Sequence, residues 1–275
     1  MNGINTNLAA LNSQRSLSNS QASLGVAVQR LSSGLRVNGA KDDAAGLAIA
    51  ERFNSQVKGM NAGVRNANDA VSLAQTAEGA LAKVSDMLQR MRELAVQSAN
   101  ASNSISDRVN LDAEFQQLGQ EITRSLAGTQ FNGSTILGAN AGTLTFQVGA
   151  GASANDVITI TSTRLDNHAT ITAVTGGSIT NAGVATSSIT SIDAAIDQVT
   201  TERANFGAAQ NRFESAISVL QVAAENNAAS RSRIMDADYA TETAALSRAQ
   251  VLQQAGTAML AQANQVPNQM LTLLR

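Results

Sequence analysis

The chain has 275 residues, a formal net charge of −2 and no basic block, so its composition argues against nucleic acid or anionic lipid as the main partner. Aromatic residues make up only 3% of the sequence, and much of the 43% hydrophobic fraction is alanine, which favours long, closely packed helices. The sequence has no cysteine, which excludes disulfides and thiolate chemistry, and no apolar run long enough to predict membrane insertion.

The N-terminal segment has the spacing of a helix that packs along one narrow face. With one slip in the pattern, the apolar positions are Ile4, Leu8, Leu11, Leu17, Leu24, Val28, Leu31 and Leu35. Residues 31–47 follow, where glycines interrupt the pattern, and they are expected to form a linker. Asp42 or Asp43 is expected to cap the next helix.

Two helices are predicted after the linker. From Phe53 the three-four pattern of apolar residues indicates one helix of more than fifty residues, roughly 80 Å long. Residues 100–106 break it, and Ser104 with Asp107 forms a capping box for a second helix. Leu111, Phe115, Leu118, Ile122 and Leu126 line one face of this second helix, which is therefore expected to fold back along the first.

The middle of the chain changes character. Residues 128–142 are expected to be a loop, and residues 143–148 and 157–163 alternate and are rich in β-branched side chains. These two stretches flank GAGASAND and predict a β-hairpin with a long turn. Residues 168–188 are poor in charge and rich in Thr, Ser, Ala and Gly, so they are expected to be a loop with some extended structure.

A second long helix is predicted from Ile189 to Ile234. Thr190 with Asp193 offers a capping box at its start, and the heptad spacing is sustained to the end. Polar residues interrupt the apolar positions, and in coiled coils such residues fix the register. They are Arg203, Gln210 and Asn227.

The C-terminal segment, residues 246–275, again has a narrow apolar stripe. Its positions are Leu252, Ala255, Met259, Ala263, Val266, Met270 and Leu273. Pro267 predicts a kink or a helix end near Gln265. Two interpretations remain open: the two terminal helices could close an ordinary core, or other copies of the chain could cover their apolar stripes.

The order of elements is symmetric, so N- and C-terminal helices are expected to pair antiparallel. The predicted fold class is mainly α, a long antiparallel helical bundle or coiled coil with a small β-hairpin region, whose terminal helices form an inner coiled-coil domain. The predicted segments are the two halves of the inner domain, the two helical parts of the rod and the exposed hairpin region. Their ranges are 1–40 and 236–275, 41–140 and 189–235, and 141–188.

No constellation of residues predicts catalysis, a cofactor or a metal. His168 is the only histidine and has no cysteine or second histidine to complete a metal site. The serine-rich runs lack a base that could activate a nucleophile. The sequence therefore predicts a protein that is not an enzyme.

Four blocks of sequence resemble the bacterial flagellin family. Residues 28–53, VQRLSSGLRVNGAKDDAAGLAIAERF, are similar to the N-terminal signature of that family. Residues 66–81 and 89–100 match two further blocks, and residues 230–242, SRSRIMDADYATE, resemble the C-terminal signature. The resemblance covers both ends of the chain in the family's order.

The resemblance implies a structural subunit that polymerises into the flagellar filament for swimming motility. In flagellins both termini form an inner coiled coil that lines the filament channel, and the subunits assemble into an open helical homopolymer. Only about forty residues lie between Gly149 and Ile189, so the resemblance implies a short form without the outer variable domains. The alternative within the resemblance is a hook–filament junction protein, which shares the terminal coiled coils but does not self-polymerise.

The resemblance also implies partners. By standard signals alone the chain would be cytoplasmic, because residues 1–8 lack a cleaved secretory signal. Flagellins leave the cell unfolded through the flagellar export apparatus, which implies a secreted protein of the extracellular filament. A secretion chaperone at the C-terminal helix, the filament cap and the hook-junction proteins are implied as further partners.

One exposed patch is implied to have a second role. Gln89, Arg90, Leu94 and Gln97 are expected on one stripe of the long helix, with Glu114 beside them on the returning helix. A solvated face or a contact between neighbouring strands of the filament would explain the stripe equally. In flagellins the matching positions bind the vertebrate flagellin receptor, so the resemblance implies recognition of the monomer, with the patch hidden in the filament.

Overall fold

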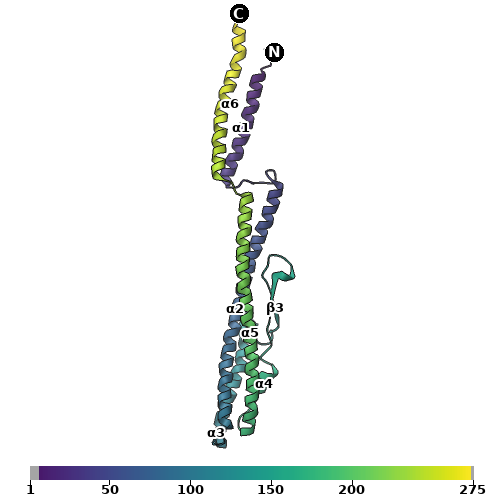
Figure 1. Ribbon diagram of the computed structural model, residues 1–275, viewed down its shortest axis with the longest axis vertical. Helices are drawn as coiled ribbons and strands as arrows, with labels where there is room; N and C mark the ends of the chain where they lie inside the picture. The colour runs from purple at the N-terminus through teal and green to yellow at the C-terminus, as the bar shows by residue number, and fades with distance from the viewer. Residues whose placement is uncertain (1–5, 274–275) are drawn as a thin grey trace. The chain divides into compact units, whose positions relative to one another are not determined.

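The computed structural model describes the backbone of residues 6–273 and the side chains of residues 6–265. Its elements are α1 (Leu8–Ser33), α2 (Ala44–Ala99), α3 (Ile105–Gly128), β1 (Gln130–Phe131), β2 (Ser134–Thr135), β3 (Thr143–Gln147), η1 (Ala154–Asp156), β4 (Val157–Thr161), α4 (Ala169–Thr175), α5 (Ala182–Met235) and α6 (Tyr239–Leu273) (Figure 1). The chain forms two compact units, residues 1–55 with 226–275, and residues 56–225.

The first unit contains α1 and α6, which lie side by side and antiparallel (Figure 1). Asn7 caps α1 by accepting a hydrogen bond from the amide of Ala10, and Gly34 ends it in the left-handed conformation, with φ 69°. The antiparallel pairing predicted for the terminal helices is confirmed. Of the predicted kink or helix end near Gln265, the helix end is wrong, because α6 continues through Pro267 to Leu273. A proline inside a helix removes one hydrogen bond and crowds the preceding turn, which does not have to end the helix.

Short backbone contacts close the base of this helix pair. Leu35 and Asp236 form an isolated antiparallel bridge, and the amide of Arg36 donates to the carbonyl of Met235 at 2.6 Å. Beneath the bridge, Val37, Ala50 and Met235 are buried together. At the start of α2, the Asp43 carboxylate accepts from the amide of Gly46 at 2.7 Å, which confirms Asp43 as the cap.

The second unit is a bundle of α2, α3 and α5. The single long helix predicted between the linker and residue 100 is confirmed, since α2 has 56 residues. The capping box of Ser104 and Asp107 is present at the start of α3 with both of its hydrogen bonds. The N-terminus of α3 is therefore fixed by its own side chains, as predicted.

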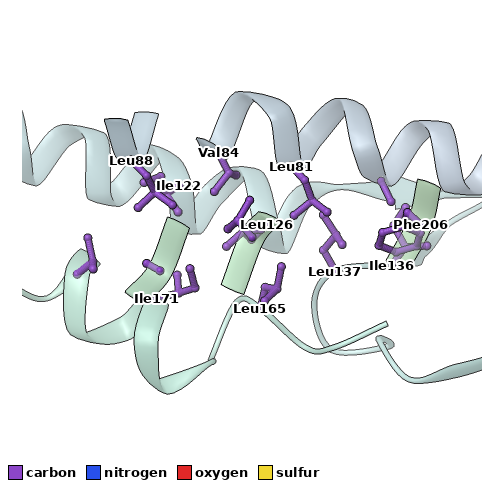
Figure 2. Packing of buried hydrophobic residues seen from close by; sticks show 14 of the residues in the cluster. Leu81, Val84, Leu88, Ile122, Leu126, Ile136, Leu137, Leu165, Ile171 and Phe206 are labelled. Carbon is purple, nitrogen blue, oxygen red and sulfur yellow. The ribbon is translucent and has the colours of Figure 1, made fainter. Parts of the chain in front are cut away.

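The core of this unit is apolar and lies between the helices (Figure 2). Leu81, Val84 and Leu88 of α2 face Ile122 and Leu126 of α3 in one layer. Phe206 of α5 and side chains from the segments after α3 complete it. Those further residues are Ile136, Leu137, Leu165 and Ile171.

Each of the two small sheets is an antiparallel hairpin. The predicted hairpin is confirmed as β3 with β4, paired from Thr143↔Thr161 to Gln147↔Val157. It packs against the bundle through Phe146, whose ring meets Phe213 edge to face at 5.5 Å. The hairpin β1–β2 was not predicted, although its turn residues Asn132 and Gly133, with φ 49° and 78°, are an Asn-Gly pair of the kind such turns require.

The prediction of a loop over residues 168–188 is wrong. Residues 169–175 form α4, and α5 begins at Ala182, so Thr190 does not start the helix. Asn181 takes that place, and its side chain accepts from the amide of Gly183 at 2.9 Å. Tertiary contacts explain the difference, because Ile171 and Ile179 are buried in the core and outweigh the weak local propensity of this stretch.

Two polar residues of the predicted heptad lie against α2. Arg203 pairs with Glu78 at 3.7 Å, and the side-chain amide of Gln210 donates to the same carboxylate at 3.3 Å. Both contacts join α5 to α2 within the bundle. Polar pairs in an apolar interface favour one alignment of two helices over others.

Candidate assembly surface

The interface between α1 and α6 follows a heptad spacing on both helices. On α1 the side chains turned toward α6 are Ala10, Ser13, Leu17, Ser20, Leu24, Ala27 and Leu31. On α6 the corresponding side chains are Glu242, Leu246, Ala249, Gln253, Gly256, Leu260 and Ala263. Alternation of leucine with alanine, serine and glycine lets the two helices approach closely.

Three contacts spread along the pair define its alignment. Near one end, the side-chain amide of Asn7 donates to the carbonyl of Ala263 at 2.7 Å. In the middle, Leu17 lies against Gly256. Near the base, Arg30 Nη1 lies 2.9 Å from Glu242 Oε1.

The largest predicted assembly residues lie outside this interface. Leu8 and Leu11 on α1 are 63% and 53% exposed, and Leu252 and Met259 on α6 are 51% and 65% exposed. Val28 is also exposed. The predicted stripe placed Leu252 and Met259 against α1, but both side chains lie outside that interface. Among the side chains of residues 6–265, these leucine and methionine residues of both terminal helices remain more than half exposed.

Other predicted assembly residues divide between the interface and the linker. Leu24 and Leu31 face α6 and are half-buried, and Leu35 is half-buried in the linker after α1. Ile4 and the side chains of the last positions lie outside the described residues. Those last positions are Val266, Met270 and Leu273.

An open groove runs between α1 and α6 where the exposed face of α6 begins. It has a volume of about 380 Å³. One wall carries the polar side chains of Asn12 and Ser16 on α1, and the other carries Leu252, Ala255 and Met259 on α6. A groove with one apolar wall can take the apolar side chains of another helix.

The second predicted patch lies on α2 and α3. Arg90 Nε lies 2.9 Å from Glu114 Oε1, and Arg90 Nη1 lies 3.0 Å from Glu93 Oε2. These hydrogen bonds, first to Glu114 and then to Glu93, raise the pKa of Arg90 above its ordinary value. The predicted proximity of Arg90 and Glu114 is therefore present in the structure.

Leu94 departs from the expected exposed stripe. Its side chain is 1% exposed and belongs to the core of the bundle. The reason is that Leu94 follows Met91 by three positions, so both point inward on the same helix face. Val96, which sequence reasoning missed, is instead 50% exposed, and it lines an open groove of about 520 Å³ with Gln89 and Gln97.

The described part of the chain contains no cluster of three or more His, Cys, Asp or Glu side chains placed to hold a metal ion. His168 lies at the start of α4, where its Nδ1 is 2.8 Å from Thr170 Oγ1. None of the described helices, which end at residue 273, is long and apolar enough to cross a membrane.

Comparison with known proteins decides the family. The bacterial flagellin N-terminal helical region matches residues 4–142, and the bacterial flagellin C-terminal helical region matches residues 189–274. The chain belongs to the bacterial flagellin family. The two matches cover most of the helices that build the two units, and the β3–β4 hairpin, α4 and the first residues of α5 lie between them.

Individual flagellins agree with this assignment. A flagellin of Halalkalibacterium halodurans is 46% identical over 272 residues, which is 99% of each chain. A flagellin of Xenorhabdus nematophila is 43% identical over 312 residues, again 99% of each. The crystal structure of Bacillus cereus flagellin has a TM-score of 0.50 with 33% identity, covering 56% of this chain and 88% of that one.

The family fixes the function at a coarse level. This flagellin is a structural subunit that self-assembles into the bacterial flagellar filament, and it is not an enzyme. At 275 residues it is a short member. The predictions of the family and of a mainly α fold with a small β-hairpin region are confirmed.

Proposed function

We propose that this flagellin assembles through the exposed apolar faces of α1 and α6. The observation that carries the proposal is the exposure of Leu8 and Leu11 on one helix and of Leu252 and Met259 on the other, next to a groove that no described side chain fills. Burying large apolar side chains contributes about 1.5–3 kcal/mol each. Contact between different faces of successive copies gives an open helical polymer.

The proposed role of each part of the chain follows the predicted segments. Residues 1–40 and 236–275 form the inner coiled coil, residues 41–140 and 189–235 form the helical part of the rod, and residues 141–188 form the hairpin region, whose exposed side chains face the solvent. The ends of α1 at Ser33 and of α5 at Met235 support boundaries near residues 40 and 236. Ile4, Val266, Met270 and Leu273 lie outside the described side chains and belong to this proposal by their sequence spacing alone.

Seeded polymerisation tests the assembly surface. The variants are Leu8→Ser with Leu11→Ser, and Leu252→Ser with Met259→Ser, and purified protein is mixed with filament fragments and followed by light scattering and negative-stain microscopy. Both double variants should fail to elongate the seeds. Val219→Ser with Val222→Ser is the matched control, because both valines are more than half exposed on α5 and two exposed apolar side chains are again replaced.

Truncation gives a second test of the same surface. Removal of residues 252–275 should leave a soluble protein that retains the helical bundle of residues 56–225. Filaments formed by the truncated chain, or by either double serine variant at the normal rate, would refute the proposed surface.

A route out of the cell belongs to the same proposal. The chain is exported unfolded through the flagellar export apparatus and joins an extracellular filament, where the filament cap and the hook-junction proteins contact the same terminal faces. Membership of the flagellin family supports this route. Detection of the chain in sheared filaments from wild-type cells, and its retention inside cells that lack the export apparatus, is the expected result.

The exposed face of α6 also supports binding of a flagellar secretion chaperone. Val251, Leu252 and Met259 are more than half exposed, so a protein that covers them before assembly would prevent premature polymerisation. Leu252→Ser with Met259→Ser should weaken chaperone binding in calorimetry. Unchanged binding would show that the chaperone binds a different surface from the one proposed for assembly.

The patch on α2 and α3 supports recognition by the vertebrate flagellin receptor. Its exposed members are Gln89, Arg90, Gln97 and Glu114, whereas Leu94 supports the patch from the core. Arg90→Asp should reduce receptor signalling by the monomer and leave folding intact. Lys83→Asp, at another exposed position of α2, is the control, and equal signalling by both variants would contradict the proposed role.

A further inference from the structure

The interface of α1 with α6 repeats itself every seven residues. Leu17, Leu24 and Leu31 follow one another at this spacing on α1, and so do Ala249, Gly256 and Ala263 on α6. A shift of one helix by seven residues, roughly 10 Å, would again place leucines opposite small residues. Apolar packing alone therefore distinguishes the two alignments poorly.

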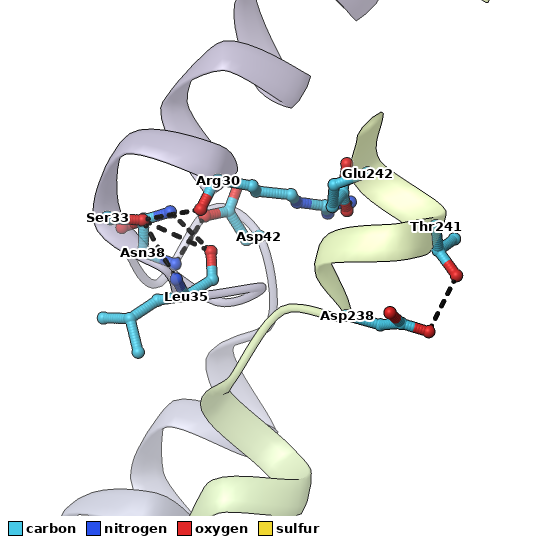
Figure 3. A network of polar contacts seen from close by, with 8 residues as sticks. All are labelled: Arg30, Ser33, Leu35, Asn38, Asp42, Asp238, Thr241 and Glu242. Carbon is cyan, nitrogen blue, oxygen red and sulfur yellow. Dashed lines mark hydrogen bonds and ion pairs between the residues drawn. The ribbon is translucent and has the colours of Figure 1, made fainter. Parts of the chain in front are cut away.

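Glu242 breaks the repeat of small residues on α6. Glu242 occupies the place on α6 that alanine or glycine occupies one, two and three heptads later, and it is 8% exposed. Its carboxylate lies 2.9 Å from Arg30 Nη1, which reaches across from α1 (Figure 3). A shift of seven residues that moves Glu242 toward Ser23 would place it among side chains that offer no matching cation, and an unpaired buried carboxylate is costly. The opposite shift would carry Glu242 beyond the end of α1 at Ser33.

We propose that the ion pair of Arg30 and Glu242 selects the alignment of α1 with α6. The pair acts as a specificity determinant, because the shifted alignments lose it whereas the leucine and alanine contacts persist. The alignment also decides which exposed residues of α1 lie beside Leu252 and Met259. This last consequence for assembly rests on the proposed function, but the alignment itself does not.

The backbone near the base offers a competing determinant. Ala237 donates to the carbonyl of Gly34 at 2.9 Å, and Leu35 forms a bridge with Asp236. A shift of seven residues toward the N-terminus of α1 would bring Val28 opposite Asp236, and Val28 already uses its backbone groups within α1, so the shift would break these contacts. If these contacts fix the alignment by themselves, removal of Glu242 will leave it unchanged.

Engineered disulfides report the alignment directly, since the sequence has no cysteine that could compete. A Cβ at Gly256 would lie 3.7 Å from Leu17 Cβ, which is close to the separation in disulfides. Leu17→Cys with Gly256→Cys therefore reports the observed alignment. Leu24→Cys with Gly256→Cys and Leu17→Cys with Ala249→Cys report a shift of seven residues in either direction.

Each reporter pair is placed in the full chain with native Glu242, with Glu242→Ala, and with the exchanged pair Arg30→Glu with Glu242→Arg. The chain is oxidised as a dilute monomer, and the disulfides are quantified by mass spectrometry. Glu242→Ala should raise the ratio of shifted to native disulfide by about tenfold. The exchanged pair should restore the native ratio, because it rebuilds the ion pair with opposite polarity.

Two results would overturn the proposal. One is an unchanged ratio in the Glu242→Ala chain, which would assign the alignment to the backbone bridge. The other result applies if Glu242→Ala abolishes every disulfide because α1 and α6 separate. In that case, the proposal is overturned if the exchanged pair fails to restore the native disulfide. These measurements use monomer, so their failure is distinct from a failure of the serine variants to alter filament growth.

Discussion

Leu17 of α1 lies against Gly256 of α6, so closely that a Cβ added to Gly256 would be 3.3 Å from Leu17 Cδ1. The closest approach of the two terminal helices therefore depends on a residue without a side chain. Gly256→Leu should force the helices apart and lower the thermal midpoint of the helix pair, measured by circular dichroism, and should slow seeded filament growth. Gly256→Ala is the milder comparison, because its gain in helix propensity of up to about 1 kcal/mol offsets part of the steric cost.

Gly63 on α2 touches the β3–β4 hairpin. A Cβ at this position would overlap the carbonyl oxygen of Val148, which is backbone and cannot rotate away. Gly63→Ala should destabilise the bundle despite its better helix propensity, whereas Gly79→Ala, where nothing lies within 4 Å, should gain up to about 1 kcal/mol. Urea unfolding of the two variants measures both effects, and equal stabilisation by the two would show that the hairpin does not dock there.

Substitutions of Leu94 and of Arg90 should differ in their effect on the stability of the bundle. Leu94→Ala should cost about 2–5 kcal/mol of unfolding free energy, because it empties a site in the core. Arg90→Ala removes only exposed ion pairs that solvent screens, and it should leave the unfolding free energy nearly unchanged. Chemical denaturation of both variants gives these values. A small loss for Leu94→Ala would place that residue outside the core.

The start of α3 should be sensitive to acid. Hydrogen bonds from the side chain and then the backbone of Ser104 lower the pKa of Asp107. A carboxyl with a lowered pKa in the folded state stabilises above its unfolded value of about 3.9, and this contribution is lost as the pH falls through the folded value. The protection of the amides of residues 105–108, measured relative to their intrinsic exchange rate at each pH, should therefore fall below about pH 3.9. Asp107→Asn should remove this dependence, and an identical acid response in that variant would assign it to another group.

The long helices could be predicted because their spacing is regular and their caps are local. Ser104 with Asp107 is a complete signal within four residues, and Asp43 is an equally local cap. It was harder to predict which face of each terminal helix packs against the other. In an alanine-rich helix several faces look apolar, and Leu252 and Met259 are larger than Ala249 and Gly256, yet the small residues take the interface because they permit close approach.

The stretch before α5 could not be predicted from local sequence for a different reason. Its fold depends on Asp112 of α3, whose carboxylate accepts from the amide of Ile179 at 2.7 Å and from Ser178 Oγ at 3.0 Å. Nothing near residue 179 in the sequence signals this partner. In the patch on α2, the pairing of Arg90 with Glu114 followed from helix geometry, whereas the burial of Leu94 depends on how three helices meet.

The contact of Gln210 with Glu78 joins residues that are 132 positions apart in the chain. Phe206 and Phe213, which complete the core of the same bundle, also lie on α5, far along the chain from α2. Although most of its structure is helical, this protein therefore has the distant pairings that make two-state proteins fold slowly. A newly made chain cannot close its main core until α5 has been synthesised, because Phe206 and Phe213 belong to that helix.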